Sequence, residues 1–184
     1  MRCSRRWASK SRFIECTTDG LRPGMILRSG MPNGAQNTNL SPVGACAGIV
    51  FGDGVCTPHS SYVDLWGDKN IDLLHLFGEQ RRSAVESDTR CALPRVRVFD
   101  MPRSWKSLPS LDEGASFLLG WMAGYFAADG CVSQSGQAVL SSARREDLEW
   151  FRTVANIVGI GTYGITESIA DKAPPGQPSR TATM

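Results

Sequence analysis

The sequence has few of the residues that build zinc-binding or disulfide-stabilised modules. It contains two histidines, His59 and His75, and no Cys-x-x-Cys pair. Its six cysteines are scattered along the chain, at Cys3, Cys16, Cys46, Cys56, Cys91 and Cys131. A structural zinc site is therefore not expected, and the scattered thiols predict a reducing compartment, the cytoplasm.

Long hydrophobic runs and a strong charge of one sign are also missing. The longest apolar run, Phe117–Ala128, is too short to cross a bilayer, so no membrane association is expected. No apolar segment follows Arg5 and Arg6, which disfavours an export signal. A net charge of +2, with 41% hydrophobic and 21% charged residues, is ordinary for a globular protein. Any nucleic-acid surface must therefore come from local clusters of arginine.

The most informative segment is Phe117–Gly130, with the sequence FLLGWMAGYFAADG. As a helix it carries one stripe of small residues, Gly120, Gly124 and Ala128, along which a second backbone could lie very close. The helix would end at Asp129, and the glycine after it lets the chain turn away. A carboxylate at a helix C-terminus opposes the helix dipole, and a bound cation would offset that cost.

The same pattern occurs a second time, in Val43–Gly54, with the sequence VGACAGIVFGDG. A single shift of the sequence aligns Gly44 with Gly120, Gly48 with Gly124, Gly52 with Ala128, and Asp53 with Asp129. Two helices with matching stripes are predicted to pack stripe to stripe, which would bring the two aspartates side by side. Two ordinary buried helices remain the alternative.

These two segments resemble the motif of the LAGLIDADG homing endonucleases. Met122–Gly130, MAGYFAADG, matches its Ala-Gly and Ala-Asp-Gly positions, and Cys46–Gly54, CAGIVFGDG, matches Ala-Gly and Asp-Gly. The resemblance extends over roughly residues 41–167. It implies an α+β fold of two αββαββ repeats related by a pseudo-twofold axis.

On this basis the chain divides into four segments. Residues 1–36 form an N-terminal segment, in which Asp19–Leu27, DGLRPGMIL, resembles a short β remnant of an intein splicing domain. The first repeat is assigned to residues 37–103 and the second to residues 111–167. Residues 168–184 are proline-rich and lack periodicity, which predicts a disordered tail. The second repeat then stops after its second helix and one strand, so it is predicted to be truncated.

Hydrophobic periodicity predicts further elements inside the two repeats. Alternation of apolar and polar residues favours strands at Tyr62–Trp66 and Pro94–Phe99. A helix is expected from Asp68, as its N-cap, to Phe77. Another helix is expected over Arg144–Val158, with an apolar face made by Leu148, Phe151, Val154, Ala155 and Val158.

Asp53 and Asp129 are the candidate catalytic and metal-binding residues. Two carboxylates at adjoining helix ends, with backbone carbonyls around them, form a hard-oxygen site that suits Mg²⁺. By motif match they inherit the family's role as ligands of metals that serve two strand breaks. Such a metal can neutralise a phosphate and orient a water for in-line attack. Alternatively, each acid caps its own turn.

The remaining charged residues are assigned weaker roles. Asp64, Asp68, Glu146 and Asp147 are interpreted as solvated strand or helix-start residues. DNA binding would use Arg95 and Arg97 on one strand face, and Lys69, Lys106, Arg144 and Arg145 toward the DNA backbone. Each of these cations taken alone is more simply a solvated charge. The family also uses a peripheral lysine near the metals, which the sequence does not locate.

The leading interpretation is a monomeric, pseudo-symmetric, Mg²⁺-dependent endonuclease of the homing type, encoded by a mobile genetic element and specific for a double-stranded DNA site. A cleavage-inactive DNA-binding relative is the second interpretation, and the predicted truncation favours it. A fragment of a larger intein-containing protein is the third, and Asp19–Leu27 favours it.

Overall fold

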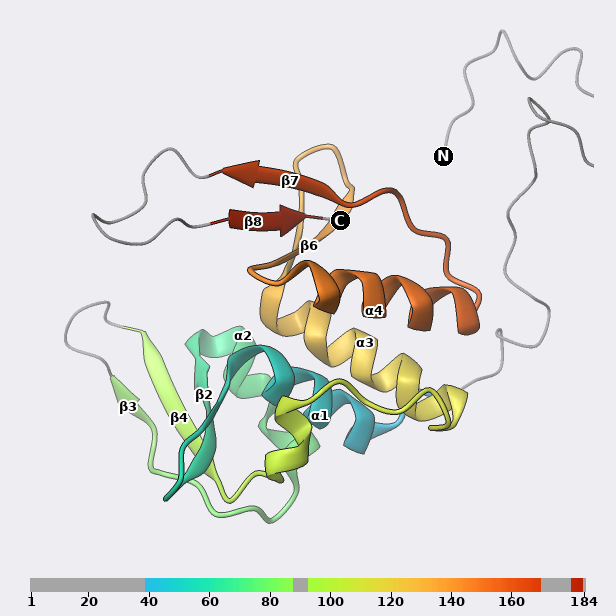
Figure 1. Ribbon diagram of the computed structural model, residues 1–184. Coiled ribbons are helices and arrows are strands. Elements are labelled where there is room, and N and C mark those ends of the chain that lie inside the picture. The colour runs from blue at the N-terminus through green and yellow to red at the C-terminus, as the bar shows by residue number, and fades with distance from the viewer. Residues whose placement is uncertain (1–38, 88–92, 170–179, 184) are drawn as a thin grey trace, which may run out of the picture.

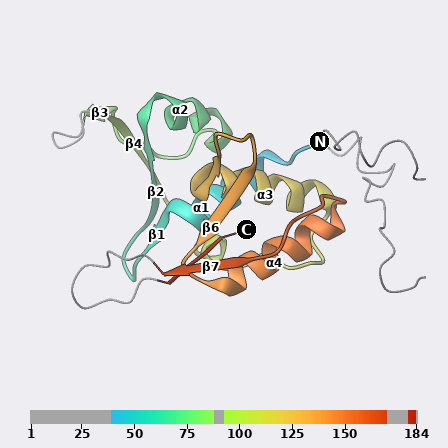
Figure 2. The ribbon, with the colours of Figure 1, turned by 90° about the horizontal axis from the view of Figure 1, so that it is seen from above.

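Two helices lie side by side at the centre of the molecule (Figure 1). The computed structural model describes residues 39–87, 93–169 and 180–183. The central helices are α1 (Pro42–Asp53) and α3 (Ala115–Asp129), and each is followed directly by a strand. Seen from above, strands β1 and β2 lie beyond the end of α1, while the described chain enters α1 from the opposite side (Figure 2). The predicted α+β class is confirmed.

Each central helix leads into a four-stranded antiparallel sheet. The first sheet has the order β1-β2-β4-β3, with strands β1 (Gly54–Cys56), β2 (Ser61–Trp66), β4 (Pro94–Phe99) and β3 (Glu86–Ser87). The second has the order β5-β6-β8-β7, with strands β5 (Gly130–Val132), β6 (Ala138–Ser142), β8 (Arg180–Thr183) and β7 (Thr166–Ile169). The two sheets therefore repeat one strand order.

Strand β8 corrects two expectations from the sequence. Residues 168–184 were expected to be disordered, and the second repeat was expected to stop after one strand. Instead, Arg180–Thr183 pairs with all four residues of β7 and with Ser141 and Ser142 of β6. Four residues are too short to show periodicity, and their pairing with two neighbouring strands decides their conformation. The predicted intein-like remnant, residues 1–36, lies outside the described residues.

Shorter helices connect the strands and cover the sheets. They are α2 (Gly67–Ile71), the 3-10 helices η3 (Asp72–Phe77) and η4 (Arg103–Lys106), and α4 (Arg145–Ile157). Helix α4 buries the predicted face, including Leu148, Phe151 and Val154, against α3. In the parts of the chain that the structure describes, no helix combines the length and hydrophobicity of a membrane span.

Helices α1 and α3 approach so closely that their glycines leave no room for a side chain. A Cβ atom added to Gly48 would lie 2.1 Å from the carbonyl oxygen of Trp121, and one on Gly124 would lie 2.0 Å from that of Ala45. Real Cβ atoms essentially never come closer than 3.0 Å to such neighbours. Any larger residue at these positions would push the two helices apart.

The contacts between the two helices are reciprocal. Gly44 faces the carbonyl oxygen of Phe117, and Gly120 faces that of Ser41, with the same 2.4 Å from an added Cβ atom. The sequence shift that carries Gly44 to Gly120 also carries Ser41 to Phe117. Each helix therefore contacts the other through the same set of glycines and carbonyl groups.

Candidate functional site

The reciprocal helix packing brings the two motif acids to one end of the helix pair. Asp53 is the last residue of α1 and Asp129 the last residue of α3, and both side chains reach solvent. A Cβ atom added to Gly52 would lie 3.1 Å from Oδ2 of Asp129. The Asp129 carboxylate therefore rests against the last turn of α1, next to Asp53.

The surroundings of both carboxyl groups favour their protonated form. Desolvation by the packed helix ends raises the pKa of Asp53, and the Lys106 ammonium lowers it in part. Desolvation also raises the pKa of Asp129, the negative charge of Asp53 raises it further, and Lys106 opposes both effects. Two like charges held together in a partly dry site would be stabilised by a cation.

Lys106 lies beside these acids. Its Nζ donates to the carbonyl oxygens of Phe51 (2.5 Å) and Gly52 (3.3 Å), which α1 leaves without an intrahelical partner. Trp105 packs against both hydrophobic cores and so anchors η4, which carries the lysine. Desolvation lowers the pKa of Lys106, while the charges of Asp129 and Asp53 raise it.

The sequence proposed Lys106 only as a contact to the DNA backbone. Its position near the acids had no signal in the sequence, because the linker that carries it, residues 102–110, has neither periodicity nor a motif. The lysine reaches the end of α1 through tertiary packing, 54 residues from Gly52 along the chain.

A second polar cluster lies at the start of α4. Arg144 donates to Asp147 through Nη2 (2.5 Å to Oδ1) and Nε (3.1 Å to Oδ2), and the Ser142 hydroxyl donates to Oδ2 (3.0 Å). The Asp147 side chain is only 8% exposed. The interpretation of Asp147 as a solvated helix-start residue was therefore wrong. A buried carboxylate at this position is stabilised by its arginine and by the N-terminus of α4.

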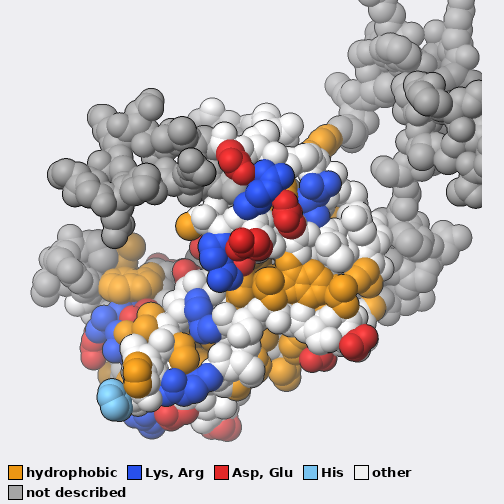
Figure 3. Space-filling model, viewed as in Figure 1, with side chains coloured by type: hydrophobic (Ala, Val, Ile, Leu, Met, Phe, Trp, Pro, Cys, Tyr) orange, Lys and Arg blue, Asp and Glu red, His pale blue; other side chains and the backbone are white. Residues whose placement is uncertain are grey.

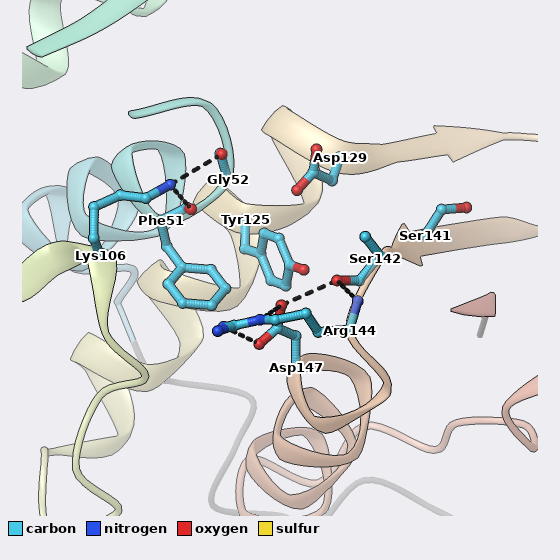
Figure 4. A pocket seen from close by; sticks show the side chains of 10 residues that line it. Phe51, Gly52, Lys106, Tyr125, Asp129, Ser141, Ser142, Arg144 and Asp147 are labelled. Atoms are coloured by element: carbon cyan, nitrogen blue, oxygen red, sulfur yellow. Dashed lines mark hydrogen bonds and ion pairs between the residues drawn. The ribbon is translucent and has the colours of Figure 1, made fainter. Parts of the chain in front are cut away.

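A cavity of about 390 Å³ connects the two clusters (Figure 4). Lys106 and Asp129 line one part of it, and Arg144 and Asp147 line another. The Tyr125 ring lies between Asp129 and the Arg144–Asp147 pair, and burial raises its pKa to about 12, so the phenol stays neutral. Asp53 is not among the lining residues.

The residues present fit a hard divalent cation that keeps part of its hydration shell. Asp53 and Asp129 supply two carboxylates, while the Phe51 and Gly52 carbonyl oxygens at the end of α1 accept hydrogen bonds from Lys106. Within the described residues, no three side chains of His, Cys, Asp or Glu converge as a metal site. Two carboxylates with water and substrate phosphate are the ligand set that Mg²⁺ commonly takes.

The proposed DNA-contacting cations are mostly paired with acids. Arg97 is paired with Asp64, Arg95 with Glu86, and Arg145 with both Glu149 and Glu167. On the face shown in Figure 3, basic side chains lie next to acidic ones and do not form one positive patch. The side chain of Lys69 lies outside what the structure describes. Asp64 is half-buried in its ion pair, so its interpretation as a solvated residue was wrong as well.

Comparison with known families identifies the second motif helix and the segment after it. Residues 116–175 match the model of the LAGLIDADG-like domain. The chain carries a LAGLIDADG-like domain. The family resemblance of Met122–Gly130 is therefore confirmed. No curated protein matches the chain.

Two solved structures share the fold of this chain at low sequence identity. The N-terminal LAGLIDADG domain of DUF199/WhiA has a TM-score of 0.52 and 12% identity, over 78% of this chain and 75% of that one. Full-length DUF199/WhiA from Thermatoga maritima also gives 0.52, with 11% identity, over 78% of this chain and 50% of that one. A variant of I-DmoI, in complex with its target DNA and in the presence of 2 mM Mn, gives 0.44 with 14% identity, over 78% and 85%.

Proposed function

We propose that the chain is a site-specific endonuclease of the homing type that hydrolyses double-stranded DNA with Mg²⁺. The observation that carries the proposal is the convergence of Asp53 and Asp129 at the ends of two reciprocally packed helices, with Lys106 beside them. The helix packing fixes both acids relative to each other before any ligand binds. A rigid placement of this kind is what a catalytic site needs.

The two repeats act in this proposal as pseudo-symmetric halves of one monomer. Two observations support this arrangement: the two sheets repeat one strand order, and each motif helix meets the other through equivalent glycines and carbonyl groups. With β8 included, the second half extends beyond residue 167, where the sequence had ended it. Double-stranded DNA would then lie across both sheets, and each half would contribute one motif acid.

The proposed chemistry is phosphodiester hydrolysis. Asp53 and Asp129 would hold Mg²⁺, which when bound neutralises phosphate charge and lowers the pKa of a bound water. A water oxygen would attack phosphorus and lose a proton to solvent, the bond from phosphorus to the leaving oxygen would break, and that oxygen would take up a proton from solvent. Lys106 and Arg144 contribute positive charge next to the scissile phosphate. Tyr125 adds a neutral phenol to the lining of the cavity.

The test incubates the parent chain and two variants, Asp53→Asn and Asp129→Asn, with a library of duplex DNA and Mg²⁺. Each variant keeps the size of the side chain and removes its charge. We expect cleavage by the parent, loss of cleavage in both variants, and retained DNA binding. Asp112→Asn, which changes an exposed acid outside the site, is the control for net charge. Cleavage that persists in either motif variant would overturn the assignment.

A cleavage-inactive DNA-binding protein is the second candidate. It is favoured by the position of Asp53 outside the cavity wall and by the ammonium of Lys106 at the end of α1. Binding of duplex DNA by the parent without cleavage in Mg²⁺ or Mn²⁺ would support this candidate over the nuclease.

A further inference from the structure

The outer face of the first sheet carries arginines, acids and aromatic rings in a fixed register. On β2 and β4, Val63, Leu65, Val96 and Val98 point into the core and are buried. The residues between them face outward. They pair across the two strands as Tyr62 with Phe99, Asp64 with Arg97, and Trp66 with Arg95.

Arg97 is held on this face by two different contacts. Its Nε and Nη2 donate to the two carboxylate oxygens of Asp64, at 2.7 and 2.8 Å. Its guanidinium carbon lies 3.8 Å from the centre of the Tyr62 ring. The carboxylate sets the direction of the guanidinium, and the ring sets its plane. The Arg97 side chain remains 29% exposed, so it is still accessible to a ligand.

The same combination of an acid and a ring recurs at the neighbouring arginines. Arg95 donates to Glu86 at 2.6 Å and lies 5.4 Å from the Trp66 ring. At the other end of the strand, Arg81 donates to Asp100 and lies 4.2 Å from the ring of Phe99. Most of the positive charge of this face is therefore balanced by carboxylates.

The hydrogen-bonding pattern of Arg97 leaves one side of the guanidinium available. Arginine has five N–H donors, of which Asp64 engages two, on Nε and Nη2. The outer edge, formed by Nη1 and the second proton of Nη2, matches the O6 and N7 acceptors of guanine in the major groove. A guanidinium already neutralised by a carboxylate gains little from a phosphate, whose binding depends on net charge.

We propose that Arg97 reads a guanine in the major groove and that Asp64 is a positioning residue. Asp64 holds the guanidinium in the reading orientation, and its charge weakens sequence-independent binding to phosphates. The inference rests on the proposed binding of duplex DNA. It does not depend on whether the chain cleaves that DNA.

The experiment first selects the preferred duplex of the parent chain from a random-sequence library, without metal. Binding is then measured by fluorescence anisotropy on the selected duplex, on a scrambled duplex, and on a selected duplex with a guanine analogue that lacks the N7 acceptor. We expect one guanine at which the analogue weakens binding by the parent about tenfold, the scale of one bidentate contact. Arg97→Ala should bind the selected duplex equally well with guanine and with the analogue at this position.

The variant Asp64→Asn separates positioning from a purely structural role. We expect it to bind the scrambled duplex more tightly than the parent does, and to prefer the selected duplex about tenfold less. A variant that was only less stable would bind both duplexes more weakly. Asp112→Asn makes the same change in net charge at an exposed residue outside the sheet and should behave as the parent.

Arg97→Lys gives an independent measurement if Asp64→Asn fails to fold. It keeps the charge but loses the planar fork, so discrimination should fall while binding to the scrambled duplex persists. Unchanged discrimination in Asp64→Asn or in Arg97→Lys would overturn the inference. If the parent enriches no duplex, both the inference and the proposed function are overturned. If the parent binds DNA without cleaving it, only the proposed nuclease activity is overturned.

Discussion

Asp53 and Asp129 carry negative charge where the fold makes that charge costly. Desolvation raises the pKa of both, so the folded chain holds their protons more tightly than the unfolded chain. The resulting loss of stability is fully present above the folded pKa. It is relieved as pH falls through that value toward the unfolded pKa. The pair therefore destabilises the metal-free protein at neutral pH.

We expect Asp53→Asn and Asp129→Asn to raise the melting temperature of the metal-free protein at neutral pH by a few degrees. Each variant removes a desolvated charge and relieves the repulsion between the two acids. Thermal melts in EDTA and then in Mg²⁺ measure the effect. Mg²⁺ should raise the melting temperature of the parent, because it binds the folded state, and should have little effect on the variants. Lower melting temperatures for both variants in EDTA would contradict this account.

Among individual residues, the sequence located the two motif acids but not the groups around them. Asp53 and Asp129 follow small-residue stripes that recur in one register, and this repetition is visible without a structure. Lys106 and Asp147 carry no comparable signal. Their roles depend on the carbonyl groups, the arginine and the cavity that they contact after the chain has folded. These contacts join residues from different elements, and no local sequence pattern predicts them.

At the scale of elements, the contact between α1 and α3 depends on the absence of side chains at four glycines. We expect Gly48→Ala to lower the free energy of unfolding by about 1–3 kcal/mol, because the added methyl would lie 2.1 Å from the Trp121 carbonyl oxygen. Chemical denaturation of parent and variant measures the difference.

Gly114→Ala is the matched control for this substitution. Gly114 precedes α3 with φ −62°, and a Cβ atom there would meet nothing within 4 Å. Because Gly114 is the N-cap of α3, where alanine is less favourable than glycine, Gly114→Ala should lower the free energy of unfolding by less than about 1 kcal/mol. Equal stability of the Gly48 and Gly114 variants would mean that the helix pair separates at small cost.

Regular periodicity made most elements predictable, and short or irregular ones were missed. Strands at Tyr62–Trp66 and Pro94–Phe99 match β2 and β4, and α4 begins and ends within one residue of the predicted helix. The helix expected over residues 68–77 is instead α2 followed by η3, and Asp68 is not its cap. Apolar spacing indicates which side is buried but does not distinguish an α-helix from a 3-10 helix.

At the scale of the whole molecule, β8 makes the end of the described chain part of the second sheet. Ala182 pairs with Glu167 of β7 and with Ser142 of β6. We expect Ala182→Pro to lower the melting temperature by several degrees, because proline has no N–H for the ladder. Ala182→Thr, with a strand-favouring side chain, should leave it unchanged or higher. Equal melting temperatures for the two variants would mean that β8 does not contribute to the stability of the folded protein.

The reciprocal glycine contacts also bear on how the two halves find each other. Each motif helix carries both the glycines and the carbonyl groups that pack against the glycines of the other helix. Either helix could therefore pack against a copy of itself as well as against its partner. The segment that runs through Arg103–Lys106 places the two helices in one chain and turns this recognition into an intramolecular event. The helix contact alone would not distinguish the first half of the molecule from the second. Chain order supplies that distinction, and with it a fixed orientation for reading any ligand whose two ends differ.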